Sequence, residues 1–380
     1  MKHFITALFC IALFFAVAGV AVASDLSNVW YEEQMVRALV LNVEEDAQGQ
    51  EVYKPGQLVT VEILGGSFRG QVLTLPHVVL DQAGYDIVVQ PGDEVVVLIY
   101  ADGEEIKTVY IADYARDTQL YYLLGAFILS LLVLGGFKGI RSIIALLITG
   151  GTILWVLLPL MMKGYDPILI TVVVCTCVTA VSLILVGGVG AKTLAAIIGT
   201  AGGVIVAGVL AFLVGTAAHL TGFVSEEMYM LHFIQQDIKF DIRGILFAGM
   251  IIGALGAMMD VGMSVASAIE EIKKANPRMR TMGLVRAGMN VGRDIMCTMS
   301  HTLILAYTGS AVPLLLVFMT YNTPYLKIIN LDIIATEVVR ALTGSIGLCL
   351  AIPITAVAAA LLMGRRSSRT NESSVYWRRA

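Results

Sequence analysis

The sequence predicts an α-helical, polytopic membrane protein that carries a small all-β domain outside the cytoplasm. The chain is 57% hydrophobic and 14% charged, with a mean hydropathy of +0.82, whereas an ordinary soluble domain is about 25% charged. Seven apolar segments are each long enough to cross the ~30 Å hydrocarbon core of a bilayer. Charge is also uneven, because residues 25–114 hold sixteen acidic and four basic side chains, a net of −12. We therefore expect two regions that meet near Asp117.

The N-terminus has the pattern of a secretory signal. Lys2 precedes an apolar run over residues 4–23, and Ala21-Val22-Ala23 offers an A-x-A cleavage site before Ser24. Residues 1–23 are expected to be a signal peptide, with an uncleaved anchor helix as the alternative. Either one delivers the next domain, residues 25–116, out of the cytoplasm.

Short alternating segments separated by Gly, Pro and Asp turns predict β-strands in residues 25–116. The candidate strands are 35–43, 58–64, 71–75, 86–89, 94–100 and 107–112. Five or six strands of this length suit a small closed barrel, similar to an OB-fold. OB-folds bind nucleic acid through basic, aromatic faces, so the acidic balance here argues against nucleic acid. A cation, a peptide or a partner domain remains a candidate ligand, beside a purely structural cap on the membrane domain.

Residues 117–363 are expected to form the transmembrane bundle, followed by a basic cytoplasmic tail at 364–380. The predicted spans are 119–136, 142–162, 167–187, 192–219, 243–266, 295–319 and 333–363. With the β domain outside, fourteen Lys and Arg fall on the inner side and four in the outer loops. The positive-inside rule therefore agrees with the signal peptide and predicts a multi-pass protein of a bacterial-type plasma membrane.

Motifs for catalysis, metals or cofactors are missing from the sequence. None of the five histidines belongs to an HExxH or i,i+4 pair, and no nucleophile elbow accompanies a Ser/His/Asp order. The run from Gly187 to Thr193 lacks the Gly-Lys-Thr adjacency of a phosphate loop. Cys175 and Cys177 point to nearly opposite sides of a helix, which favours apolar packing over a metal site. We therefore expect no enzyme, no metal and no cofactor.

Ionisable residues within the predicted spans are the candidate functional residues, because each costs roughly 2.5–3.5 kcal/mol on insertion scales. Asp260 is the clearest of them. It lies on a helical stripe of small and polar residues, which must face protein or water rather than lipid. The stripe consists of Gly249, Gly253, Gly256, Asp260, Ser264 and Ser267.

Arg293 and Asp294 open the next span at a similar or slightly shallower depth, and His301 lies about two turns deeper. Glu337 and Arg340, three apart in the last span, are close enough to pair. Two interpretations stay open. Either these groups neutralise one another as ion pairs that pack helices, or they form a proton or ion relay beside a substrate path.

Four strings of the sequence resemble the YibE/F family of bacterial membrane proteins. They are residues 243–260, 288–296, 302–307 and 335–340. The order of signal, outer β domain and multispan bundle is also similar, and the likeness covers about residues 30–363. The resemblance implies the fold and the membrane location, and it implies no biochemical activity.

A fainter resemblance concerns mechanism. Asp260, the basic loop after it and the run from Arg293 to Ser300 are similar to the central region of proton-driven RND and SecD/SecF-type proteins. That resemblance implies proton coupling at Asp260. We accordingly expect a transporter or permease-like factor of unknown substrate, in contact with the lipid bilayer and with a protein partner or a second copy. The alternative is a non-transporting scaffold or sensor whose acidic outer domain binds a partner.

Overall fold

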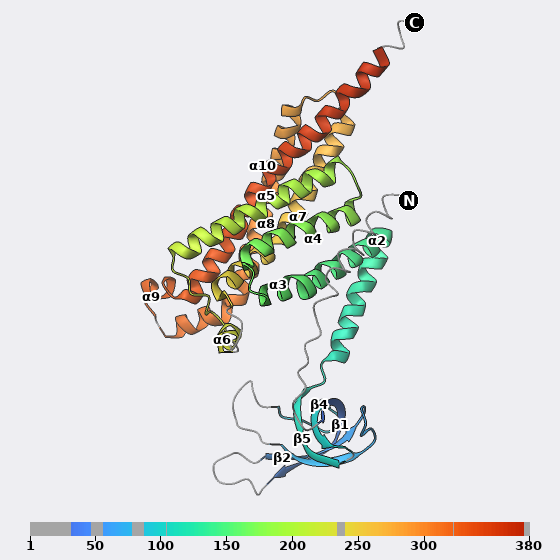
Figure 1. Cartoon of the computed structure of the whole chain (residues 1–380), viewed down its shortest axis with the longest axis vertical. Helices are drawn as coiled ribbons and strands as arrows, with labels where there is room; N and C mark the ends of the chain where they lie inside the picture. Colours follow the sequence, from blue (N-terminus) through green and yellow to red (C-terminus); the bar gives the residue numbers. More distant parts are fainter. Residues whose placement is uncertain are drawn as a thin grey trace. The chain divides into compact units, whose positions relative to one another are not determined.

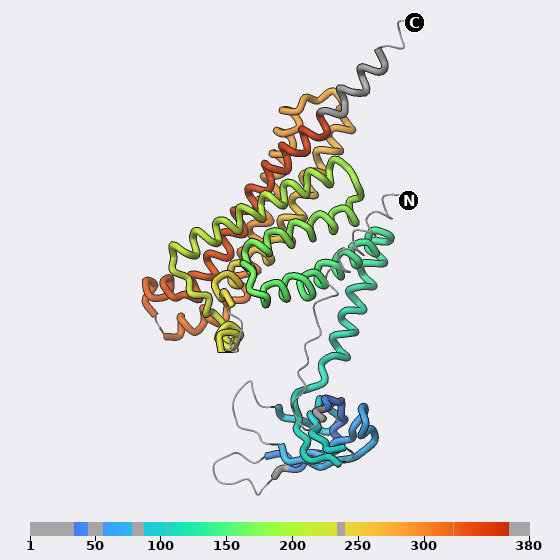
Figure 2. The backbone as a smooth tube through the Cα atoms, in the orientation of Figure 1, coloured from blue at the N-terminus to red at the C-terminus, as the bar shows by residue number. Residues whose placement is uncertain are grey.

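The computed structural model describes residues 32–46, 56–77, 87–103, 105–233, 240–321 and 323–375, and Figure 2 traces the backbone. The expected signal peptide lies outside the described residues. The described chain divides into two compact units, one ending at Ser130 and the other beginning at Leu131. This division falls inside helix α2 (Asp117–Thr152).

The first unit contains a five-stranded antiparallel half-barrel (Figure 1). Its strands are β1 (Glu32–Asp46), β2 (Gly56–Ile63), β3 (Val72–His77), β4 (Glu94–Asp102) and β5 (Glu105–Tyr114). The order is β3-β2-β1-β4-β5, so the long β1 pairs with both β2 and β4. Burial alternates along β2 and β4, as a sheet with one face on a core requires. The alternate inward positions of these two strands, such as Val61 and Val97, are fully buried.

Five of the six predicted strands form, and the prediction of a strand at 86–89 is wrong for the part that is described. Residues 87–89 contain no strand, and side chains rather than a ladder satisfy their backbone. The Gln57 amide donates to the Val89 carbonyl at 3.1 Å and accepts from the Val89 N–H at 3.2 Å. The Tyr114 hydroxyl donates to the Val88 carbonyl at 2.5 Å. These bonds tie an irregular segment to strands β2 and β5.

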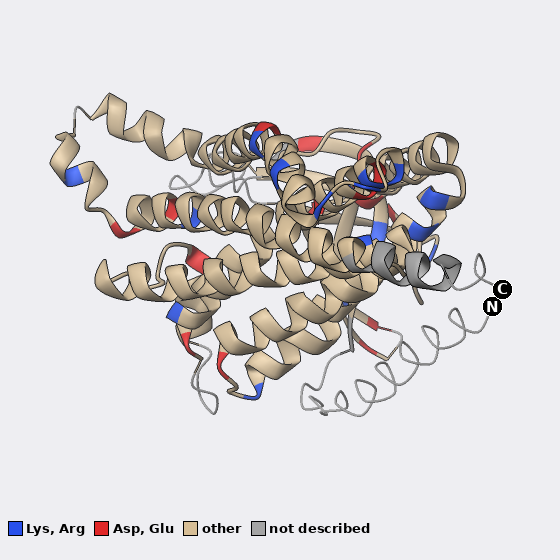
Figure 3. Ribbon diagram, turned by 90° about the horizontal axis from the view of Figure 1, so that it is seen from above, with Lys and Arg blue, Asp and Glu red and all other residues tan. Residues whose placement is uncertain are grey.

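Six helical stretches of the described chain are long and apolar enough to cross a membrane. They are Asp117–Met162, Pro167–Gly187, Ala191–Ala217, Ile242–Ala275, Thr281–Thr320 and Asp332–Gly364. The first combines α2 (Asp117–Thr152), the π-helical turn η1 (Ile153–Leu157) and α3 (Leu158–Met162), and the next four are α4, α5, α7, α8 in order. The last belongs to α10 (Asp332–Val375), and α6 (Glu226–Phe233) and α9 (Tyr325–Ile329) are short connections. Most of the helical ribbon carries no Lys, Arg, Asp or Glu (Figure 3).

The first helical stretch contains both of the first two predicted spans. Gly136 has φ 52° and ψ −132°, which is not helical and which only glycine adopts readily. A Cβ placed on Gly139 would collide with the backbone carbonyl oxygen of Leu131, eight residues earlier. In a straight helix eight residues span about 12 Å, so the chain bends sharply back at Gly136.

Helices α4, α5, α7, α8 and α10 pack around one hydrophobic core. Small residues allow close approach, which drives helix association where lipid is as apolar as the side chains. A Cβ on Gly203 of α5 would lie 2.8 Å from the Gly347 carbonyl oxygen of α10. Gly199, four residues earlier on α5, contacts Thr355 in the same interface. Other buried members of the core, such as Met258 and Leu348, fill the space between these contacts.

Polar contacts tie the helix ends together on opposite sides of the bundle. At one end, Glu270 of α7 pairs with Lys192 of α5 at 3.2 Å and with Lys274 at 3.6 Å. At the other end, the Thr221 hydroxyl donates to Asp332 at the start of α10 at 2.5 Å. These contacts fix which loops share a side of the bundle.

Candidate functional site

Glu337 and Arg340 form an ion pair within α10. The Arg340 Nη1 donates to Glu337 Oε1 at 2.5 Å, and the side chains are 24% and 22% exposed. The i,i+3 spacing on one helix turn brings the groups together without help from another helix. The structure therefore places this predicted pair in contact.

Tyr307 of α8 joins this pair from the neighbouring helix, and the sequence reasoning did not single it out. Its hydroxyl is buried and lies within electrostatic range of both Arg340 and Glu337. A Cβ on Gly253 of α7 would lie 2.6 Å from the Tyr307 Oη. The available signal was a tyrosine inside an apolar span, because a buried phenol normally needs a polar partner.

Two oxygen atoms of the group formed by Tyr307, Glu337 and Arg340 are still able to form hydrogen bonds. Tyr307 Oη and Glu337 Oε2 are both buried, and neither has a hydrogen-bond partner among the described residues. Buried polar atoms are rarely left so, and exceptions often mark functional places. Helices α8 and α10 thus bring a buried tyrosine hydroxyl and a buried carboxylate oxygen into one region, where α7 packs against the tyrosine.

Asp260 lies near the middle of α7, 18 residues after Ile242 and 15 before Ala275. Its side chain is exposed on the surface of this chain, as are Gly249, Gly256 and Ser264 of the same stripe. No described residue forms a hydrogen bond or ion pair with the Asp260 carboxylate. The stripe therefore faces away from the chain's own core.

Contacts between α7 and α8 give the depth of Asp260 relative to the next span. Gly288 of α8 contacts Ile269 of α7, and a Cβ on Gly292 would lie 3.6 Å from Val265 Cγ2. The two helices are antiparallel neighbours, and Gly292 lies beside Val265. Five residues before Val265 is Asp260 and five residues after Gly292 is Cys297, so these two residues lie at the same level. Arg293 and His301 are one turn to either side of that level, about 6 Å each along the axis.

The remaining predicted residues are not brought together by direct bonds. Arg293, Asp294 and His301 are all exposed on α8. Arg293 donates to the Asn290 side chain at 3.4 Å. In the described part of the chain none of the three has an ion-pair partner, and Arg293 does not pair with Asp260.

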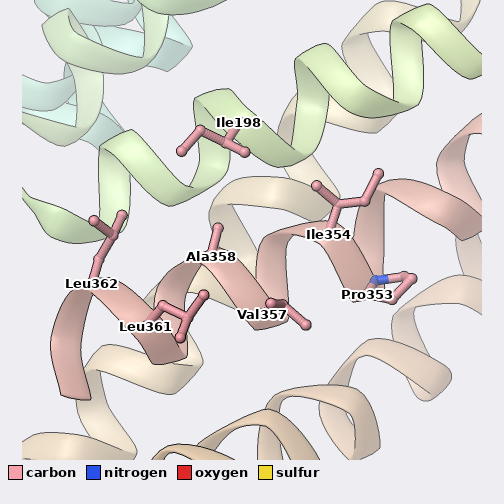
Figure 4. Close-up of a pocket in the computed structure, with 7 residues that line it drawn as sticks. All are labelled: Ile198, Pro353, Ile354, Val357, Ala358, Leu361 and Leu362. Atoms are coloured by element: carbon pink, nitrogen blue, oxygen red, sulfur yellow. The ribbon is translucent and has the colours of Figure 1, made fainter. Parts of the chain in front are cut away.

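A groove with a volume of about 660 Å³ lies between α5 and α10, beside Pro353 (Figure 4). The side chains that line it are all apolar and belong to Ile198, Pro353, Ile354, Val357, Ala358, Leu361 and Leu362. A groove without a polar side chain offers little to orient a substrate. Among the described residues no three His, Cys, Asp or Glu side chains gather as they would around a metal ion.

Fold and site together define a multi-pass membrane protein with ionisable groups inside its spans and a separate β unit before them. The family model of the YibE/F-like proteins matches residues 123–365, and that of the YibE/F family N-terminal domain matches residues 31–114. The chain belongs to the YibE/F-like family. Comparison with curated proteins and with solved structures gave no match.

Proposed function

We propose that the protein is a transporter or permease-like factor in which Asp260 exchanges protons as the bundle alternates between two states. The observation that carries this proposal is the unpartnered Asp260 carboxylate within an apolar span. On α8, Arg293 lies one helical turn to one side of the level of Asp260, and His301 lies one turn to the other side.

Energetics favour proton exchange over a fixed charge within one chain. An ionised carboxylate at mid-span costs roughly 2.5–3.5 kcal/mol on insertion scales. For Glu337, the ion pair with Arg340 on the next turn offsets this cost. Asp260 has no such partner within the described chain, so binding a proton is the remaining way for one chain to neutralise it.

Residues on α8 would set the two environments of this carboxylate. Arg293 nearby would favour the ionised form, and removal of Arg293 by a small helix movement would favour the protonated form. Asp294 and His301, seven residues apart on the same side of α8, would pass protons along the helix. Such a relay needs water to reach the face during the cycle.

We further propose seven crossings, with the β unit outside and the C-terminus in the cytoplasm of a bacterial-type cell. The bend at Gly136 supports two crossings from the first helical stretch, since 46 residues in one straight helix would extend about 69 Å, over twice the hydrocarbon thickness. Seven crossings put the basic loop at 276–280 on the inner side. The β unit's strand order, with β1 shared by both hairpins, supports an OB-like fold.

A scaffold or sensor is the alternative function, and one observation favours it. The β unit has its own hydrophobic core, which includes Val59, Val97 and Ile99, so it is built like an independent binding module. In that case an outer partner binds the half-barrel and the bundle serves as an anchor. Function would then tolerate a neutral residue at position 260 and would be sensitive to changes on the half-barrel surface.

Replacement of Asp260 by asparagine tests the proposal, because asparagine keeps size and hydrogen bonding while it removes titration. In a strain that lacks the gene, the Asp260→Asn protein should reach normal abundance but should not restore the wild-type phenotype. Glu271→Gln, which neutralises an exposed carboxylate near the end of the same helix, is the control and should complement. An abundant Asp260→Asn protein that complements fully would show that proton coupling at this position is wrong.

A further inference from the structure

One face of the bundle combines polar and ionisable side chains that the chain itself leaves uncovered. We define this polar face as Asp260 and Ser264 on α7 with Arg293, Asp294, Cys297 and His301 on α8, and all six are exposed. The α7 stripe borders α8 directly, because Tyr307 reaches across to Gly253. The six residues thus belong to adjoining surfaces of two packed helices.

Contact between this polar face and lipid chains would be energetically unfavourable. Asp260 is about 9 Å along the axis from Ala266, where its predicted span ends, counted as six residues. A short aspartate side chain cannot reach the headgroup region over that distance, in contrast to a long lysine or arginine near a helix end. Helix α8 is also the least covered span, with 6% of its apolar window buried against 56% for α7.

We propose that the polar face is covered by the same face of a second copy, so that the partner's Arg293 reaches Asp260. A two-fold axis along the membrane normal brings residues of equal depth opposite one another. Asp260 is level with Cys297 and about 6 Å from the level of Arg293. An arginine side chain bridges such an offset, and the symmetry makes the pair twice.

Charge complementarity selects a second copy as the occupant. The face carries Asp260 on α7, and Arg293 beside Asp294 on α8, so the acidic α7 residue of one copy can meet the basic α8 residue of the other. The contact with Asn290 leaves the Arg293 guanidinium its remaining donors for a carboxylate. Each copy then completes the other's Asp260 site, and in the proposed function the two states of Asp260 are with and without the partner's Arg293. The dimer itself rests on exposure and depth, and it stands even if Asp260 exchanges no proton.

Two native cysteines provide a matched test in the full-length protein. Cys297 lies in the polar face and Cys177 is exposed on α4. Two single-cysteine variants keep one of these and replace the other four cysteines by serine or alanine. After copper-phenanthroline oxidation in native membranes, the Cys297 variant should give a covalent dimer and the Cys177 variant should stay monomeric. A cysteine at Gly256, where a Cβ meets open space, should also cross-link. This second position tests the interface even if the two Cys297 thiols of a dimer are too far apart to form a disulfide.

Native mass spectrometry of the untreated protein in nanodiscs gives the second measurement, and a mass of two chains is expected. Asp260→Lys should reduce the dimer fraction at least tenfold, and the double variant Asp260→Lys with Arg293→Asp should restore it. A monomer mass, a heteromeric mass, equal cross-linking through Cys177, or a dimer that cross-links at neither Cys297 nor Gly256→Cys would each overturn the proposal. If the dimer is found but Asp260→Asn complements a deletion, the interface holds and the proton-coupling function fails.

Discussion

Tyr307 of α8 lies directly over Gly253 of α7, and a methyl group on Gly253 would be 2.6 Å from the phenol oxygen. This contact links the α7 stripe to the Glu337–Arg340 pair of α10. It is also the point at which α7 packs against the polar groups that α8 and α10 bring together.

Gly253→Ala should therefore destabilise the protein by about 1–3 kcal/mol, because the methyl displaces the Tyr307 side chain. Thermal unfolding in detergent measures the effect. Tyr307→Phe alone should be nearly neutral, since its hydroxyl has no hydrogen-bond partner among the described residues. In the Tyr307→Phe protein the same Gly253→Ala change should cost less. Gly249→Ala, where a Cβ meets open space, is the control, and equal losses at both glycines would refute the contact.

Neutralising one member of the Glu337–Arg340 pair should leave the other charge uncompensated. Glu337→Gln and Arg340→Gln should each cost about 1–3 kcal/mol, somewhat below the 3–5 kcal/mol of a fully buried pair because both side chains are about a quarter exposed. The double variant should lose less than the sum of the two. Glu271→Gln removes an exposed i,i+3 pair with Lys274 and should change the melting temperature little. Strictly additive losses at 337 and 340 would exclude direct pairing.

Patterns of local period predicted most of the fold. The alternation of apolar and polar residues predicted five strands, and the length and hydropathy of the apolar runs predicted the helical stretches. Both patterns arise because the side of an element that meets the core or the lipid must be apolar. The segment at 87–89 was misassigned because its apolar residues resemble a strand while Gln57 and Tyr114 satisfy its backbone. A side chain from a distant strand leaves no signal in the local pattern.

The candidate site was predicted unevenly for a related reason. Glu337 and Arg340 are neighbours on one helix turn, so their contact follows from spacing alone. The Tyr307 contact depends on how three helices are packed, which the sequence does not specify. The orientation of Asp260 likewise depends on packing. The stripe was recognised, but its exposure on the chain surface and the lack of a bond to Arg293 emerged only from the arrangement of α7 and α8.

The half-barrel should fold as a separate polypeptide of residues 25–118. Its strands have their own core, and Arg37 of β1 bonds to Asp117 and Thr118, so this fragment keeps both contacts. The fragment contains no cysteine, so reducing agent should leave its circular dichroism and melting curve unchanged. It should not bind single-stranded DNA, because its acidic balance opposes phosphates. Salt-sensitive binding to DNA would contradict this.

Cysteine accessibility labelling in intact cells distinguishes seven crossings from six. Single cysteines at Asn276 and Ser373 should react only after the membrane is permeabilised, and cysteines at Gln48 and Asn322 should react from outside. The reason is the bend at Gly136, which makes two crossings of the first helical stretch. If that stretch crosses once, position 276 changes sides, and its labelling from outside would exclude the proposed topology.

The central claim is that Asp260 gains and loses a proton within the membrane, and carbodiimide labelling measures this without knowledge of a substrate. Dicyclohexylcarbodiimide reacts with protonated carboxyl groups in apolar surroundings, and mass spectrometry of the α7 peptide reports the modified fraction. In membranes labelled between about pH 5 and about pH 9, labelling of Asp260 should fall steeply through the neutral range, as a proton carrier requires. The ion-paired Glu337 should stay unlabelled, and Asp260→Asn should abolish the signal. An Asp260 that stays unmodified across the whole range, as a permanently ionised group would, contradicts the account.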